Sequence, residues 1–95
     1  MSAYFIVDVE VHDMPGMMEY RQQVPGIMAK YGGRYVVRGG KFETLEGTWH
    51  PKRLSLVEFP SVEQAKLWYD SEEYRPFKAM RLRAAKTNVV LLEGQ

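Results

Sequence analysis

The fold of this chain is decided by the stretch Tyr31-Gly32-Gly33-Arg34-Tyr35-Val36-Val37-Arg38-Gly39-Gly40. Its first two glycines end a helical pattern, because glycine adopts the left-handed backbone of a helix C-terminus at little steric cost. The β-branched and aromatic residues 34–38 predict a strand, and the second glycine pair permits a bulge or a close backbone approach at its end. A helix that leads directly into a strand indicates a mixed α and β fold.

The residues before this stretch predict a strand followed by a helix. Residues 4–11 are rich in β-branched and aromatic side chains, and the first half is apolar on both faces. Asp13 is a suitable N-cap with Pro15 in the first turn, and Pro25 predicts a kink near Gln22. One apolar stripe at helical spacing follows, made of Met17, Tyr20, Val24, Ile27, Met28 and Tyr31.

The residues after it predict two strands and two helices. We expect residues 41–46 to continue the second strand irregularly, a hairpin turn near Gly47, and a third strand over 53–59. Ser61 and Gln64 have capping-box spacing, in which Gln64 reaches back to the cap. The second helix has a buried stripe of Val62, Ala65, Trp68 and Tyr69. Ser71 is the predicted N-cap of a third helix, whose inward residues are Tyr74, Phe77, Met80 and Ala84. A last strand spans 87–93.

This βαββαβ order, with an extra helix before the last strand, predicts an α+β fold. Right-handed crossovers give a four-stranded antiparallel sheet of order 4-1-3-2 with helices on one face. We place strands one and three as parallel neighbours. The other face would carry few charges, and pairing of two such sheets into a dimeric barrel would cover it.

Composition limits the classes of function. The 95 residues predict a single domain over 1–95, and the net charge of +1 favours neither nucleic acid nor acidic membranes. The absence of cysteine excludes disulfides and thiol catalysis. The N-terminus lacks the features of a signal peptide, and no apolar run approaches the roughly 18 residues of a membrane helix. We therefore expect a cytoplasmic protein without a membrane partner.

The chain resembles the uncharacterised domain of unknown function (DUF) 1330 family of the dimeric α+β barrel superfamily. The resemblance rests on residues 31–34, 38–40, 46–47, 53, 58–61, 68–74 and Arg81, which span nearly the whole chain. It implies a ferredoxin-like fold and a homodimer. It implies little chemistry, because the family has no settled activity, and superfamily relatives such as cofactor-free monooxygenases provide analogy only.

Three charged residues on the predicted strands are catalytic candidates. Asp8, Arg38 and Glu58 each lie late in a strand, and the expected pairing brings Arg38 within a residue of Glu58 and Asp8 to the same end. An arginine between two carboxylates is either a structural ion cluster or the floor of a pocket for an anionic or carbonyl ligand.

A second group contains aromatic residues with polar tips. Tyr20, Trp68, Tyr69 and Tyr74 come from helices on the same sheet face, and Arg81 on the third helix is positioned to meet them. Such residues either surround a small flat ligand or form an ordinary core. The predicted ligand-binding residues are Tyr20, Arg38, Trp68, Tyr74 and Arg81.

No metal or cofactor motif is present. His12 and His50 have no second ligand at metal spacing, and the glycine pairs do not open a helix as phosphate-binding loops do. We therefore expect neither a metal nor a cofactor.

Three functions remain open. The first is a small-molecule pocket, binding or enzymatic, in which Arg38 orients the ligand, Tyr20 and Tyr74 donate hydrogen bonds, and Glu58 or Asp8 acts as base. The second is a structural dimer or assembly subunit. RNA binding ranks lowest, because the third strand lacks the exposed aromatic residues of RNA recognition motifs.

Overall fold

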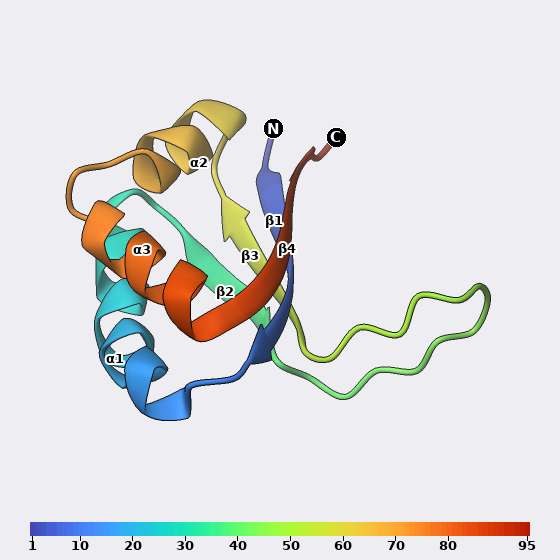
Figure 1. The fold of residues 1–95 in the computed structure, drawn as a ribbon. Helices are drawn as coiled ribbons and strands as arrows, with labels where there is room; N and C mark the ends of the chain where they lie inside the picture. Colours follow the sequence, from blue (N-terminus) through green and yellow to red (C-terminus); the bar gives the residue numbers. More distant parts are fainter.

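The computed structural model describes residues 1–95 and confirms the predicted element order (Figure 1). The elements are β1 (Ala3–Val11), α1 (Met14–Lys30), β2 (Arg34–Arg38), β3 (Leu54–Phe59), α2 (Val62–Tyr69), α3 (Arg75–Ala84) and β4 (Ala85–Glu93). The last strand begins two residues earlier than predicted, directly after α3. No helix has both the length and the hydrophobicity needed to span a lipid bilayer.

The four strands form one antiparallel sheet of order β2-β3-β1-β4, which is the predicted order counted from the other edge. The prediction that β1 and β3 run parallel is wrong. The α1 crossover makes β1 and β2 parallel, and β3 lies between them in the opposite direction. As a result, residues late in β1 lie beside residues early in β3.

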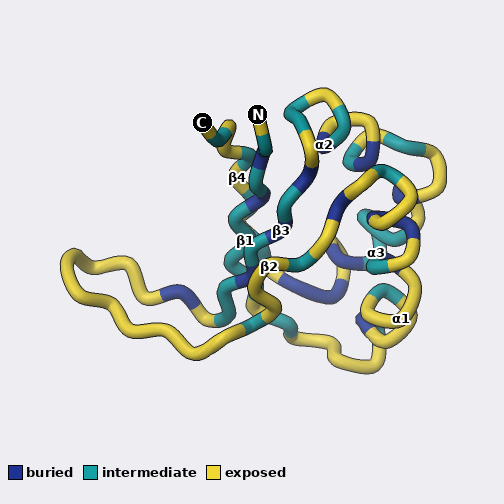
Figure 2. The backbone as a smooth tube through the Cα atoms, turned by 180° about the vertical axis from the view of Figure 1, so that it is seen from behind, coloured by how far each residue is buried: buried dark blue, intermediate teal, exposed yellow.

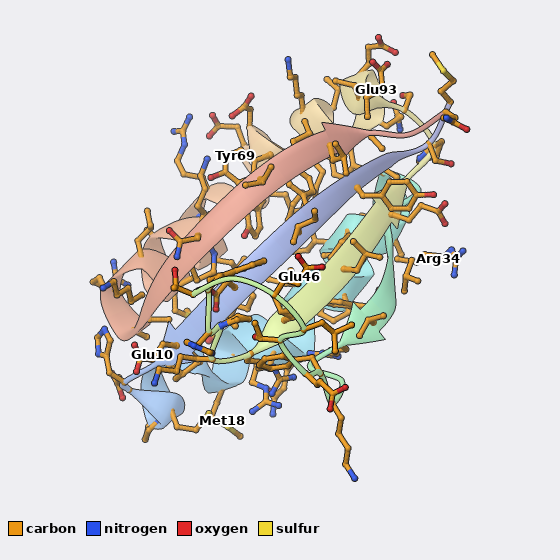
Figure 3. All side chains as sticks on the ribbon, turned by 90° about the vertical axis from the view of Figure 1, so that its right-hand side faces the viewer. Glu10, Met18, Arg34, Glu46, Tyr69 and Glu93 are labelled. Carbon is orange, nitrogen blue, oxygen red and sulfur yellow. The ribbon has the colours of Figure 1, made fainter.

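The helices cover one face of the sheet and leave the other face open (Figure 1). Strand side chains alternate between the faces, so every second residue meets the helices. Figure 3 views the sheet from the opposite side, which we call the open face. The open face includes Tyr4, Ile6, Asp8, Arg34, Val37, Leu54, Leu56, Glu58, Lys86, Asn88, Val90 and Leu92.

The hydrophobic core lies between the sheet and the helices, where Figure 2 shows most of the buried residues. The predicted stripe of α1 is confirmed, with Met17, Val24, Ile27 and Met28 buried. Gly33 fits tightly beside it, since an added Cβ would lie 2.4 Å from the Phe59 ring.

Local signals in the sequence set most helix ends. Asp13 caps α1 by accepting a hydrogen bond from the Gly16 amide, and Gly32 follows the helix with a φ of 84°. Ser61 caps α2 through the Gln64 amide. The Gln64 side chain differs from the prediction, because its Nε2 donates to the Tyr31 carbonyl and joins α2 to the end of α1.

Residues 39–53 form a long irregular arm between β2 and β3. Figure 1 shows it projecting away from the helices, and Figure 2 shows it largely exposed. The prediction that residues 41–46 continue the strand is wrong. Gly39 already turns the chain with a φ of 65°, and no neighbouring strand pairs with the residues beyond it.

A β-bulge at Val36 reorients the end of β2. Tyr35 pairs with Val57, but Val37 pairs with Leu56, so one extra residue lies between them. Strict alternation would point Arg38 to the face opposite Tyr35. Because of the bulge, both side chains lie on the helix side of the sheet.

Candidate functional site

A cavity of about 370 Å³ lies between the sheet and the helices. Its floor comes from all four strands and its walls come from all three helices. Fourteen of the 21 lining residues are hydrophobic, and this size and composition suit a small organic ligand.

The five predicted ligand-binding residues all line this cavity. They are Tyr20, Arg38, Trp68, Tyr74 and Arg81. Tyr69, the remaining member of the predicted aromatic group, lines it as well. The structure thus brings together residues from α1, β2, α2, α3 and the turn before α3.

The predicted grouping of Asp8, Arg38 and Glu58 is wrong. In the antiparallel register Asp8 pairs with Leu54, at the opposite end of β3 from Glu58. Arg38 pairs with Ser55 and faces the cavity, whereas Asp8 and Glu58 belong to the open face. Neither carboxylate can therefore act as a base on a ligand in this cavity.

Glu58 instead belongs to a network on the open face. It accepts hydrogen bonds from the Tyr4 hydroxyl at 3.1 Å and from the Arg34 guanidinium at 2.6 Å. The Tyr4 hydrogen bond, followed by the Arg34 contacts, lowers the pKa of the Glu58 carboxyl.

Asp8 holds the base of the arm. One carboxylate oxygen accepts from Trp49 Nε1 at 3.2 Å, and the other accepts from the Lys52 amide at 3.1 Å. This structural role accounts for a charged residue at this position of β1.

Arg81 is the most unusual polar residue of the cavity. It is 4% exposed, and its Nη1 donates to Thr87 Oγ1 at 2.5 Å. None of the three ion pairs in the molecule includes it. A buried charge is normally paired with an opposite charge, so this guanidinium has unused capacity to bind an anion.

Two tyrosine hydroxyls lie near Arg81. The oxygens of Tyr20 and Tyr74 are 2.7 Å apart and share a hydrogen bond. Burial raises the pKa of the Tyr20 hydroxyl well above its usual range, and Tyr74 adds to this rise. Burial lowers the pKa of Arg81, but the two tyrosines outweigh this effect and the net direction is upward. The site therefore places two hydroxyls beside a buried guanidinium.

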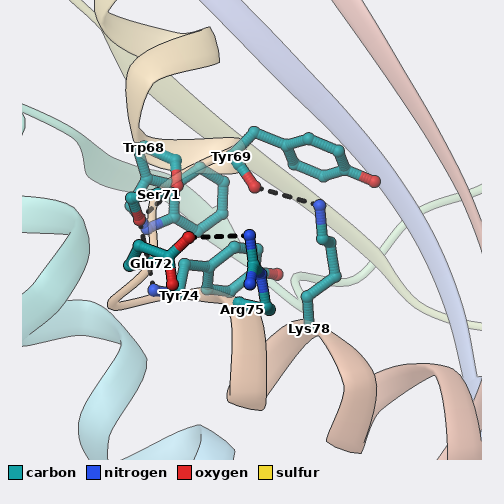
Figure 4. Close-up of polar contacts among 7 residues, drawn as sticks. All are labelled: Trp68, Tyr69, Ser71, Glu72, Tyr74, Arg75 and Lys78. Carbon is teal, nitrogen blue, oxygen red and sulfur yellow. Dashed lines mark hydrogen bonds and ion pairs between the residues drawn. The ribbon is translucent and has the colours of Figure 1, made fainter.

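The aromatic walls are fixed by packing and by the turn between α2 and α3 (Figure 4). The rings of Trp68 and Tyr74 stack at 4.1 Å between centroids, and buried Trp68 Nε1 has no hydrogen-bond partner. Ser71 was predicted to cap α3, but its Oγ accepts from the Tyr74 amide within the preceding turn. Lys78 donates to the Tyr69 carbonyl and lies over the Tyr69 ring.

Several lining residues were missed by the sequence analysis. They are chiefly Glu10, Arg21, Tyr35, Lys52, Arg53 and Ser55. Alternation along β3 could have identified Ser55, which shares a face with Val57 and Phe59. Tyr35 could not be placed on the same face as the predicted residue Arg38 without knowledge of the bulge.

The histidines take no part in the cavity. Neither His12 nor His50 lines it, and both are exposed. No group of three or more His, Asp or Glu side chains is arranged to hold a metal ion.

Comparisons with solved structures show where this fold recurs. The protein of unknown function RPA0582 from Rhodopseudomonas palustris matches with a TM-score of 0.78 and 18% identity, over 99% of this chain and 82% of that chain. Its methylated form matches with the same TM-score and 17% identity, over 99% and 81%. SnoaB, a cofactor-independent oxygenase from Streptomyces nogalater, matches with a TM-score of 0.67 and 11% identity, over 99% and 93%.

Sequence comparison gives the family but no activity. No protein of curated function matches the chain. The model of the domain of unknown function DUF1330 matches residues 2–95, nearly the whole length. With its ferredoxin-like α+β fold and its predicted motifs, this chain belongs to the DUF1330 family.

Proposed function

We propose that this protein binds a small anionic compound with an apolar or aromatic body in the cavity between sheet and helices. The observation that carries the proposal is Arg81, a buried guanidinium without a carboxylate partner, in a cavity with mostly hydrophobic walls. A carboxylate, phenolate or enolate would complete its hydrogen bonding, and the Tyr20–Tyr74 pair lies nearby to donate a hydrogen bond.

The charge of the lining supports this ligand class. Five basic residues line the cavity, Arg21, Arg38, Lys52, Arg53 and Arg81, against the single acidic residue Glu10. The whole chain has a net charge of only +1, so positive charge is concentrated at this cavity. Such concentration favours entry of anions and excludes cations.

Binding of 2-naphthoate, compared with its neutral amide, tests the proposal. In a Trp49→Phe background Trp68 is the single tryptophan, so its fluorescence reports on the cavity wall. We expect the acid, and not the amide, to change this fluorescence and to raise the melting temperature. Arg81→Gln should weaken binding about tenfold or more, since a charge-assisted hydrogen bond is lost.

Arg83→Gln is the matched control. Arg83 lies on the same helix, is exposed and does not line the cavity, so its loss changes the net charge equally without touching the ligand. Absence of binding by 2-naphthoate and by a panel of phenols would contradict the proposal. That result would favour a structural dimer without a ligand.

Cofactor-free oxidation of a bound phenol is a second candidate. It is favoured by the tyrosine pair beside Arg81, because the hydroxyls and the guanidinium would stabilise a bound phenolate by hydrogen bonds and charge while the phenol proton leaves to solvent water. The fold is shared with the cofactor-independent oxygenase SnoaB. Oxidation of 1-naphthol by one O₂ to a quinone and one water would appear as oxygen consumption, and Arg81→Gln should abolish it.

We also propose that the open face pairs with a second copy of this chain. Val90 and Leu92 are 56% and 52% exposed on it. The open face carries both acidic residues, Asp8 and Glu58, and the basic residue Lys86. When two identical faces meet, the acidic groups of one copy can therefore pair with the basic group of the other. Val90→Glu should convert a dimer to a monomer in analytical ultracentrifugation. Leu82→Glu, on the outer side of α3, should not, and a wild-type monomer would contradict the proposal.

A further inference from the structure

The cavity has cationic groups at opposite edges of the sheet. Arg81 bonds to Thr87 of β4, one edge strand, whereas Arg38 belongs to β2, the other edge strand. Between them, one row of paired residues runs across the sheet from Arg38 through Ser55 and Val7 to Val89. Three strand spacings of about 4.8 Å place the backbones of the two edge strands about 14 Å apart, and Arg38 and Arg81 both reach into the cavity between them.

At the β2 end of the cavity, specific contacts hold the Arg38 side chain in place. The bulge at Val36 points Arg38 toward the helices, where its guanidinium carbon lies 4.7 Å from the Tyr35 ring centroid. Its Nη2 also donates to the Arg21 carbonyl at 3.2 Å. These contacts fix the side chain without neutralising its charge, because no ion pair includes it.

A second arginine reinforces this end. The Arg53 guanidinium lies against Gly39, where an added Cβ would be 2.5 Å from it. Gly39 therefore leaves space that another residue would fill. Arg53 and Arg38 both line the cavity, and neither belongs to an ion pair.

The floor between the two ends is apolar apart from Ser55. Val7, Val57 and Phe5 contribute to it, and Trp68 forms part of the wall. A ligand with one charged group would satisfy Arg81 and leave the Arg38 end unpaired. A ligand with an acidic group at each end and an aromatic body would contact all three regions.

We infer that the ligand is a dianion, of the class of aromatic dicarboxylates or carboxylate-bearing phenolates. Arg81 and the tyrosine pair bind one acidic group, and Arg38 with Arg53 binds the other. This inference rests on the proposed function, since it assigns the second charge of a ligand whose first charge meets Arg81.

The experiment compares matched monoacids and diacids by titration calorimetry. The pairs are benzoate with terephthalate, and 2-naphthoate with naphthalene-2,6-dicarboxylate. In the wild-type protein we expect the better-fitting diacid to bind about tenfold more tightly than its monoacid, because its second carboxylate makes one additional charge-assisted contact. Arg38→Gln should reduce this ratio to below about threefold, because the diacid loses a contact that the monoacid does not make.

Two control variants distinguish a direct contact of Arg38 with the ligand from a general effect of net charge. Arg83→Gln removes the same charge away from the cavity and should keep the tenfold ratio. Arg81→Gln should weaken monoacid and diacid alike. Raising the salt concentration should narrow the ratio, because Arg38 is exposed and screened whereas Arg81 is buried.

The two proposals fail in distinguishable ways. If the monoacids bind through Arg81 but no diacid binds more tightly, the dianion inference is overturned and the proposed function stands. A tenfold ratio that persists in Arg38→Gln also overturns it. If no monoacid or diacid binds the folded wild-type protein, both proposals fall together. Circular dichroism and the melting temperature of each variant verify that it is folded.

Discussion

The Tyr20 hydroxyl on α1 and the Tyr74 hydroxyl before α3 share a hydrogen bond of 2.7 Å inside the cavity. The two residues are 54 positions apart in the chain, so this bond joins α1 to the start of α3. It also keeps both oxygens next to the Arg81 guanidinium, where they affect its pKa.

The first prediction concerns the strength of this pair. Tyr20→Phe and Tyr74→Phe should each lower the free energy of unfolding by about 1 kcal/mol, since each leaves one hydroxyl without its partner. The double variant should cost less than the sum of the single variants. Urea denaturation of all four proteins measures this coupling. Additive effects would show that the hydroxyls do not interact.

The second prediction concerns alkaline pH. An unfolded tyrosine ionises near pH 10, whereas burial raises the pKa of Tyr20 in the folded protein. Above pH 10 the unfolded chain therefore releases a proton that the folded chain keeps, and the free energy of unfolding falls as pH rises. Tyr20→Phe should remove about 1.4 kcal/mol per pH unit of this slope. Leu67→Ala removes no ionisable group and should leave the slope unchanged.

The third prediction compares two glycines of different surroundings. Gly33→Ala should destabilise the protein by about 1–3 kcal/mol, because its Cβ would overlap the Phe59 ring and the Met28 side chain. Gly26→Ala lies in α1 with no atom near the new Cβ and should stabilise by about 0.5–1 kcal/mol. Thermal unfolding gives both values. Equal shifts in one direction would contradict this packing.

The fourth prediction concerns the attachment of the arm. Asp8→Ala removes the acceptor for Trp49 Nε1 and for the Lys52 amide. Hydrogen exchange of the Lys52 amide should accelerate, and proteolysis within residues 39–53 should become faster. Glu46→Ala, an exposed arm residue without a side-chain hydrogen bond to the sheet, is the control. Unchanged protection in Asp8→Ala would show that the arm is held by other contacts.

Local signals in the sequence determined the elements and their ends. The Gly32-Gly33 pair ends α1, Asp13 and Ser61 cap their helices, and the apolar stripes select the buried faces. These features depend on residues a few positions apart, so the sequence displays them directly. The strand order followed from the element order and the handedness of crossovers.

The candidate site was only half predictable. The helix faces placed Tyr20, Trp68, Tyr74 and Arg81 on one side of the sheet, and the cavity contains them all. The strand residues depended on pairing across the sheet. The register separates Asp8 from Glu58, and one bulged residue decides where Arg38 points.

The sequence by itself thus determined the helices, the strands and the family, because their signals are local or summed over the whole chain. Tertiary structure alone decided the cavity's charge pattern. A shift of one residue in a strand exchanges its two faces, and no local signal in residues 34–38 marks the bulge at Val36. The stretch that ends α1 therefore also carries Arg38, whose position opposite Arg81 only the assembled sheet defines.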